Sequence, residues 1–195
     1  MKPGDVFEAH LRESIRTKER LLAAGGPSVE AAGRLLAGAI AAGNKVLFCG
    51  NGGSAADSQH FATELVVRLS SAFERPALAA LSLTTDTSLL TACANDYSFE
   101  EVFARQVEGL GRAGDVLVGI STSGKSENVR RALERARARG LGTVLLAGGD
   151  GGTCKALADV AVVVPSTVTA HIQECHLAIG HVMCELVERL ACGRG

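Results

Sequence analysis

The sequence predicts an α/β fold, a three-layer, doubly wound sandwich with a five-stranded parallel sheet of the flavodoxin-like type. Short apolar runs of strand length alternate with longer, helix-like segments. Hydrophobic residues make up 47% of the 195 residues, enough for the core of one compact domain over residues 1–195. Aromatic residues are only 4% and glycines number 23, which favours a core of Ala, Leu and Val with many tight turns.

The expected strands are apolar runs bounded by polar or Gly-rich turns, at about residues 46–49, 77–83, 116–120, 143–146 and 160–164. The expected helices have amphipathic or capped segments, at about residues 5–24, 28–43, 54–69, 98–109, 128–139 and 169–190. Ser28 is expected to cap the second helix. The pairs Ser54–Asp57 and Ser98–Glu101 have the spacing of capping boxes.

Composition excludes several classes of protein. The formal net charge of -1 gives no basic footprint for nucleic acid. No run reaches the roughly 20 apolar residues of a membrane helix, and residues 1–20 lack an apolar signal region, so a cytoplasmic protein is expected. The six cysteines contain no Cys-x-x-Cys pair, which argues against a disulfide framework or a zinc ribbon and predicts small buried hydrophobic residues.

Two loops follow neighbouring strands of the predicted sheet. In an open parallel sheet, ligands bind beyond the carboxyl ends of the strands, where loops meet helix N-termini. The loop after residues 46–49 reads Gly50-Asn51-Gly52-Gly53-Ser54. The loop after residues 116–120 offers four hydroxyls around Gly124, those of Ser121, Thr122, Ser123 and Ser126. Hydroxyls, free amides and a helix N-terminus together can form a binding site for a phosphate monoester. An ordinary turn that caps a helix has the same composition and is the alternative.

Nucleotide-binding motifs are incomplete in this chain. The first loop fits the dinucleotide fingerprint as Gly50-x-Gly52-x-x-Ala55, but Glu74 and Asp86 lie in the wrong places for its acidic partner. No Gly-x-x-x-x-Gly-Lys-Ser/Thr phosphate loop occurs. Neither a nicotinamide enzyme nor a P-loop nucleotidase is therefore favoured.

The helix after the first loop carries a polar stripe. His60, Glu64 and Arg68 follow one another at four-residue spacing and share a face. A solvated, ion-paired stripe is the simplest interpretation. The apolar neighbours instead favour a helix that is buried on most sides and whose polar stripe needs a partner or ligand. These neighbours are Phe61, Leu65, Val66 and Val67.

The closing helix has polar residues among apolar ones: Gln173, Glu174, His176 and His181. Each of its histidines can also be a hydrogen-bonded core residue. Gln173 and His181 are eight residues apart, roughly 12 Å of helical rise, which is long for two ligands of one metal unless Gln173 reaches across from the helix entry.

Taken together, these motifs resemble one family. They are Cys49 to Ser54, His60-Phe-Ala-Thr-Glu64 with Arg68, Ala94-Asn95-Asp96, Gly119 to Ser126, and Ile172-Gln173-Glu174 with His181. In this order, over nearly the whole chain, they closely resemble the bacterial phosphoheptose isomerases of the sugar isomerase (SIS) superfamily. The resemblance implies an aldose-ketose isomerase that converts D-sedoheptulose 7-phosphate to D-glycero-D-manno-heptose 7-phosphate through an enediol, in the biosynthesis of nucleotide-activated heptose.

The resemblance also implies roles for individual residues. Glu64 and His181 would be the catalytic acid and base. Substrate would be bound by Asn51, Gly52, Gly53, Ser54, Glu64, Arg68, Asn95, Asp96, Ser121, Thr122, Ser123, Ser126 and Gln173. One Zn²⁺ per subunit would be held by His60, Glu64, Gln173 and His181, and a metal-free proton-transfer site with the same Glu64 and His181 is the alternative.

The family further implies a homotetramer with active sites between subunits, in which about residues 1–25 form an oligomerisation helix. The amphipathic leading helix and the apolar closing helix agree with this assembly, because together they carry more apolar surface than one five-stranded sheet can cover. Enzymes of this type usually carry Arg where this chain has His171, so substrate orientation can differ. Two other functions stay open: a non-enzymatic SIS tetramer that binds the replication initiator, and another SIS sugar-phosphate enzyme.

Overall fold

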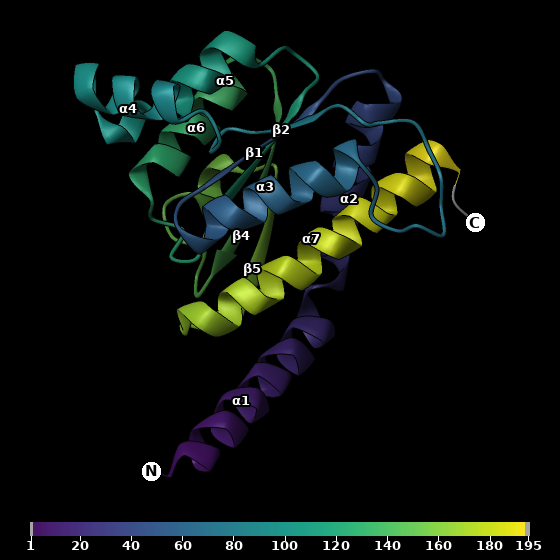
Figure 1. Cartoon of the computed structure of the whole chain (residues 1–195), viewed down its shortest axis with the longest axis vertical. Helices are drawn as coiled ribbons and strands as arrows, with labels where there is room; N and C mark the ends of the chain where they lie inside the picture. The colour runs from purple at the N-terminus through teal and green to yellow at the C-terminus, as the bar shows by residue number, and fades with distance from the viewer. Residues whose placement is uncertain (1, 194–195) are drawn as a thin grey trace.

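The computed structural model describes residues 2–193 and contains the expected parallel sheet. Its strands are β1 (Val46–Gly50), β2 (Ala80–Ser82), β3 (Val116–Ser121), β4 (Gly142–Gly148) and β5 (Val160–Val164), in the order β2-β1-β3-β4-β5 (Figure 1). The chain steps from β1 outward to β2 and then crosses to β3 on the other side of β1. The loops after β1 and β3 therefore open side by side at the point where ligands bind in such sheets.

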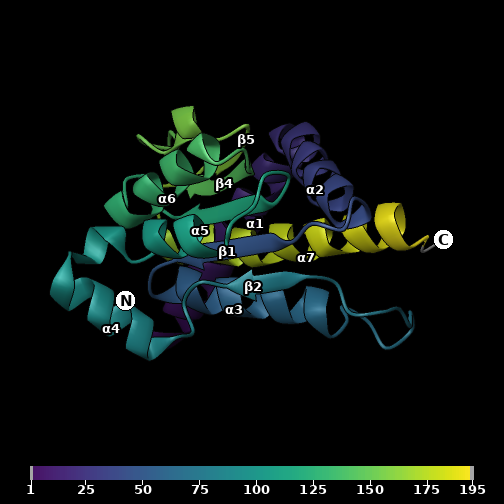
Figure 2. The same cartoon turned by 90° about the horizontal axis from the view of Figure 1, so that it is seen from above.

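Helices cover both faces of the sheet, which confirms the three-layer prediction. On one face lie α2 (Gly26–Ala41), α3 (Gly53–Val66) and α7 (Thr169–Cys192), and on the other α5 (Ala104–Leu110) and α6 (Glu127–Ala138) (Figure 2). Side chains alternate between the two cores, so that Phe48 of β1 packs under α3 whereas Leu47 faces the α5–α6 layer. Strands buried on both faces read as continuous apolar runs, which is why β1 and β3 were recognisable.

Several local expectations were wrong. The helix α4 (Thr87–Asp96) was not expected; the Asp86 side chain accepts a hydrogen bond from the Leu89 amide and caps it. The helix expected over 98–109 is divided into a 3-10 turn, η1 (Phe99–Glu101), and α5, and a second such turn, η2 (Lys155–Leu157), precedes β5. The strand expected over 77–83 is the short edge strand β2.

The expected caps are also different. Helix α3 begins at Gly53, and its N-cap is Gly52, two residues before the predicted cap Ser54. Gly52 has a φ of 56°, which only Gly adopts readily, so backbone geometry and not a side chain starts this helix. Helix α2 likewise begins at Gly26, and the Ser28 hydroxyl donates to the Gly25 carbonyl. The prediction for cysteines is confirmed at five positions, with Cys192 partly exposed.

Helix α1 (Pro3–Ala24) projects from the body of the chain beyond α7 (Figure 1). Its buried residues are the polar Ser14 and Thr17, which face α7. Leu21 packs against the core, whereas most of the other apolar side chains point away from it: Phe7 is 69% exposed and Leu22 is 84% exposed. The amphipathic helix was predicted correctly, but its polar side is the one that contacts the rest of the chain.

Helices α3 and α7 pack in parallel, and their alignment decides which polar residues meet (Figures 1 and 2). A Cβ at Gly180 would overlap the Phe61 ring, so the missing side chain lets the two helices approach closely. Farther along, the Arg75 Nε lies 3.0 Å from a Glu188 carboxylate oxygen, and both side chains are almost fully buried. This ion pair fixes the segment that follows α3 onto α7.

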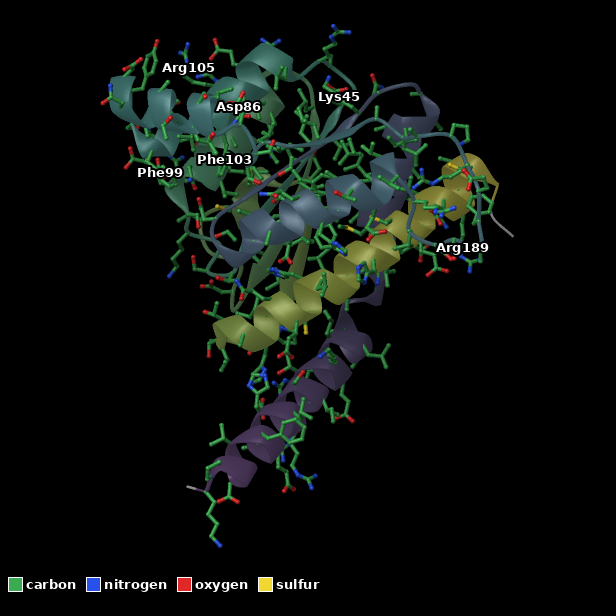
Figure 3. The ribbon with its side chains drawn as sticks, viewed as in Figure 1. Lys45, Asp86, Phe99, Phe103, Arg105 and Arg189 are labelled. Carbon is green, nitrogen blue, oxygen red and sulfur yellow. The ribbon has the colours of Figure 1, made fainter. Side chains whose placement is uncertain are left out.

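An ion pair between Lys45 and Asp115 joins the amino ends of β1 and β3, at the end of the sheet opposite the two loops (Figure 3). The hydrogen bonds from Lys45 hold the pKa of Asp115 below its usual range despite burial. Within residues 2–193, the structure contains no helix with the length and apolar character needed to cross a bilayer.

Candidate active site

The hydroxyl-rich loop, residues 121–126, connects β3 to α6 and is held by its own hydrogen bonds. The Ser121 and Ser126 hydroxyls lie 2.9 Å apart, and the Lys125 amide donates to the Ser123 hydroxyl at 3.2 Å. Gly124 has a φ of 63°, and a Cβ there would overlap the Gly151 carbonyl, so this turn requires Gly. The loop thus collects hydroxyls and amides at the N-terminus of α6, as an anion site needs.

The loop after β1 is fastened to the same place. The Asn51 and Asn128 side-chain amides exchange two hydrogen bonds, of 2.9 and 2.8 Å, which join this loop to the first turn of α6. Asn128 is buried and was missed by the sequence reasoning, although an amide directly after the hydroxyl-rich loop was a usable signal. Ser54 is buried behind Gly50, where a Cβ would lie 2.8 Å from the Ser54 Cβ. The bonds of Asn51 to Asn128 thus hold this loop against α6, and the contact of Asn51 with substrate stays a prediction.

A cleft of about 800 Å³ opens beside the hydroxyl-rich loop. It is lined by Thr122, Ser123 and Lys125, by the loops after β4 and β5, and by Glu13 and Arg20 of α1. Arg20 is paired with Glu13 at 2.9 Å. The cleft thus presents hydroxyl and cationic groups together, which suits an anionic sugar derivative.

Three of the predicted metal ligands meet between α3 and α7. The His60 and His181 Nε2 atoms are 2.7 Å apart, and His60 Nε2 lies 3.4 Å from a Glu64 carboxylate oxygen. The three ligand atoms all lie within 4.8 Å of one another. The Glu64 side chain is 16% exposed and that of His60 is 40% exposed, so the cluster is reachable from solvent. Two imidazoles and a carboxylate at these distances can exchange a proton or bind a metal ion.

Asp57 belongs to the same stripe of α3 and was assigned only to a helix cap by the sequence reasoning. It lies one turn before His60, and its Oδ2 atom is buried without a hydrogen-bond partner among the described residues. Burial raises the pKa of its carboxyl group, while nearby His60 acts in the opposite direction. A carboxyl group in this state is a candidate proton carrier. Its three-residue spacing from His60 was the available signal.

Gln173 lies on α7, next to the start of α3. Its amide is packed against Gly53, so closely that a Cβ at Gly53 would overlap it. It is therefore beside the loop after β1, two turns of α7 before His181. The structure brings His60, Glu64 and His181 together, and the participation of Gln173 as a fourth ligand stays a prediction.

Arg68, Asn95 and Asp96 lie outside this group. Arg68 follows the end of α3 and pairs with Glu74 at 3.0 Å. Asn95 donates to Asp96 at 2.8 Å at the exposed end of α4, where Asp96 lines a separate pocket of about 250 Å³ with Arg105 (Figure 3). None of these contacts joins the three residues to the hydroxyl-rich loop or to the histidine cluster.

His176 is a core residue, as the simpler interpretation of this histidine had it. It is buried, and its Nε2 lies 3.2 Å from the Ala147 carbonyl oxygen. Burial lowers its pKa to about 4, so it is neutral at physiological pH.

Val66 and Val67, at the end of α3, are exposed, so α3 is buried only along the sides that contact the sheet and α7.

Comparisons with known proteins agree with this geometry. The family model of the SIS domain matches residues 9–148. A phosphoheptose isomerase of Pelodictyon phaeoclathratiforme is 53% identical over 91% of this chain and 84% of its own length. One from Akkermansia muciniphila is 54% identical over 87% of this chain and 89% of its own.

Solved structures give the same result. A phosphoheptose isomerase from Neisseria gonorrhoeae aligns with a TM-score of 0.88 and 46% identity, covering 96% of this chain and 99% of that one. One from Francisella tularensis aligns with a TM-score of 0.93 and 35% identity, covering 97% of this chain and all of that one. The chain belongs to the SIS domain family and, within it, to the phosphoheptose isomerases.

Proposed function

We propose that this protein is an aldose-ketose isomerase that converts D-sedoheptulose 7-phosphate to D-glycero-D-manno-heptose 7-phosphate, in the biosynthesis of nucleotide-activated heptose. The observation that carries the proposal is the His60–Glu64–His181 cluster, which lies on α7 and on α3, the helix that follows the loop after β1. Relatives that share most of this chain are phosphoheptose isomerases by name. The highly charged sugar phosphate does not cross a bilayer readily, and we propose the cytoplasm as the location.

The proposed reaction moves a carbonyl from C2 to C1 of the sugar through an enediol. A proton leaves C1, a proton arrives at C2, and the hydroxyl proton shifts between the two oxygens, so no oxidant is needed. The Glu64 carboxylate is the proposed base at carbon, and the His181 imidazole carries the proton between the oxygens. Their shared neighbour His60 lies within 2.7 Å of His181 and 3.4 Å of Glu64, which keeps both groups in one cluster.

The phosphate is assigned to the hydroxyl-rich loop, with Ser121, Thr122, Ser123 and Ser126 as donors. Gly52 and Gly53 would add backbone amides from the neighbouring loop. The Ser54 amide donates to the Asn51 carbonyl at 3.0 Å, so Ser54 would help to hold that loop in shape. Gln173, which lies next to Gly53, would contact the sugar close to the phosphate.

Replacing Ser123 with Ala is expected to raise the KM for the phosphorylated substrate about tenfold or more, because a charge-assisted hydrogen bond contributes roughly 1.5–3 kcal/mol. Steady-state kinetics would measure the change, and the exposed Ser71, which follows the other end of α3, provides Ser71→Ala as the control. An equal rate with unphosphorylated sedoheptulose would contradict the assignment of this loop.

Zinc fits the cluster, since two imidazoles and a carboxylate are the ligand set of many catalytic zinc sites. His60, Glu64 and His181 would hold it, with the Gln173 amide oxygen as a fourth ligand if that side chain turns toward them. When bound, zinc would polarise the substrate carbonyl. A carboxylate has two oxygens, so Glu64 can keep one for a metal and accept a proton on the other.

The variant His60→Ala is expected to lose one zinc ion per chain together with activity, and chelation of the wild type is expected to stop turnover until zinc is restored. Elemental analysis and activity, measured on the same samples, would check this. Thr63→Ala, an exposed change on the same helix, is the control. A chelated enzyme that keeps full activity would show instead that proton transfer there needs no metal.

We also propose a homotetramer with active sites between subunits, in which about residues 1–25 form the oligomerisation helix. Support comes from the exposed apolar side of α1 and from an apolar groove of about 600 Å³ among α1, α2 and α7. Neighbouring subunits would then supply the outward-facing Arg68, Asn95 and Asp96. Light scattering should give the mass of four chains, and Leu22→Glu, at an 84% exposed position, should weaken assembly without unfolding the chain. A stable wild-type monomer at micromolar concentration would contradict the tetramer.

A further inference from the structure

A second cluster of histidine and carboxylate side chains lies where α1 meets α7. His10 Nε2 is 2.8 Å from one Glu174 carboxylate oxygen, and His171 Nδ1 is 3.8 Å from the other. The two imidazole rings are tilted against each other, with centroids 4.5 Å apart. One ligand atom from each of the three residues lies within 4.8 Å of the others. The cluster therefore has the donor types and the spacing of a metal site.

His171 provides an independent observation. Its side chain is buried, and its Nδ1 atom has no hydrogen-bond partner among the described residues. A buried nitrogen without a partner costs free energy, and here it faces a carboxylate and a second imidazole. A metal ion between the three groups would satisfy this atom.

We propose that His10, His171 and Glu174 bind a divalent transition-metal ion of the zinc class, at a site separate from the His60–Glu64–His181 cluster. The two clusters have no residue in common, and the ligand atoms of each lie within 4.8 Å of one another, so they form two separate sites. The donor set of two imidazole nitrogens and a carboxylate favours zinc or cobalt over magnesium or calcium, which prefer all-oxygen sites. The exposed side of His10 leaves a coordination position for water.

The groups around Glu174 support this role. The Ser14 hydroxyl donates to Oε2, and Lys18 Nζ lies 3.4 Å from the same atom. The carboxylate is thus held by hydroxyl, imidazole and ammonium groups at hydrogen-bond or ion-pair distance. Because Ser14 and Lys18 hold Oε2, they orient the carboxylate while Oε1 faces His10, as outer groups do in metal sites.

A metal ion at this site would fix the direction of α1. This helix contacts the rest of the chain through its polar side, and most of its apolar residues are exposed. A metal bound by His10 on α1 and by two residues on α7 would fasten the two helices at one point. The site would therefore be structural, and it would fix how α1 presents its apolar stripe.

Zinc titration of the His60→Ala protein tests the proposal, since this variant lacks the first cluster. After chelation and dialysis, calorimetric titration with Zn²⁺ should give one site per chain, and Mg²⁺ should give none. Adding His10→Ala should weaken that site at least about tenfold. Arg12→Ala is the matched control on the same helix; Arg12 is exposed and pairs with Glu8 outside the cluster, so its replacement should keep the site.

A His60→Ala protein that binds no zinc, or that binds it equally well after His10→Ala, would overturn the proposal. Elemental analysis of the wild type and its single variants gives a second test. Zinc lost with His60→Ala but fully kept with His10→Ala would support the catalytic site alone and overturn this one. Zinc lost with His10→Ala and kept with His60→Ala would support this site and contradict the catalytic one. Because His10 is exposed, His10→Ala is not expected to unfold the chain.

Discussion

Glu64→Gln is expected to lower kcat for sedoheptulose 7-phosphate about 10²- to 10⁴-fold, the range attributed to a positioned general base. The amide has nearly the same shape as the carboxylate, so helix α3 should be unchanged, but it cannot accept a proton from carbon. His181→Ala should cause a loss of similar size, because it removes the imidazole that carries protons between the oxygens. Steady-state assays with matched zinc content would measure both.

Glu185 offers the control for this prediction. It lies one turn after His181 on α7, is partly exposed and pairs with Arg189 at 2.7 Å (Figure 3). Glu185→Gln makes the same chemical change outside the cluster and should leave kcat nearly unchanged. Equal activity of the Glu64→Gln and Glu185→Gln enzymes would remove Glu64 from the proposed mechanism.

Replacing Glu188 with Ala is expected to lower the free energy of unfolding by about 3–5 kcal/mol, because it leaves a buried guanidinium without its counter-charge. The Arg75 side chain would keep its hydrogen bonds to the carbonyls of Glu64 and Leu65, at 2.7 and 2.8 Å. These bonds to neutral oxygens do not replace a carboxylate in a site that excludes water. Urea unfolding at one fixed protein concentration would measure the loss.

Arg68→Ala provides the comparison for the buried pair. Arg68 and its partner Glu74 are both exposed, so breaking their pair should cost less than about 1 kcal/mol. A Glu188→Ala protein as stable as Arg68→Ala would contradict the view that the buried pair fixes the segment after α3 onto α7.

The fold was predictable where burial leaves a pattern in the sequence. The residues of β1 and β3 are buried on both faces, so they appear as short apolar runs, each followed by a turn. Helix α4 has no such pattern, because Cys93 is its only buried residue. The edge strand β2 pairs only with β1, over three residues, so propensity alone gave too long a strand.

The site was predictable only within single elements. The four-residue spacing of His60 and Glu64 places them on one face of α3 whatever the rest of the chain does. The contact of His60 with His181 depends on how α3 and α7 are aligned, and no local pattern encodes that alignment. The same holds for His10 and His171, which come from helices far apart in the sequence. Residue types therefore predicted the chemistry, and packing decided which groups meet.

The measurement that tests the central claim most directly is an NMR assay of the purified full chain with D-sedoheptulose 7-phosphate in ²H₂O. The account predicts conversion to D-glycero-D-manno-heptose 7-phosphate with deuterium from solvent at C2, because the enediol takes its new proton there from an exchangeable group. The rate should fall in the Glu64→Gln enzyme. A folded, zinc-replete wild-type protein that leaves the ketose unchanged would contradict the account.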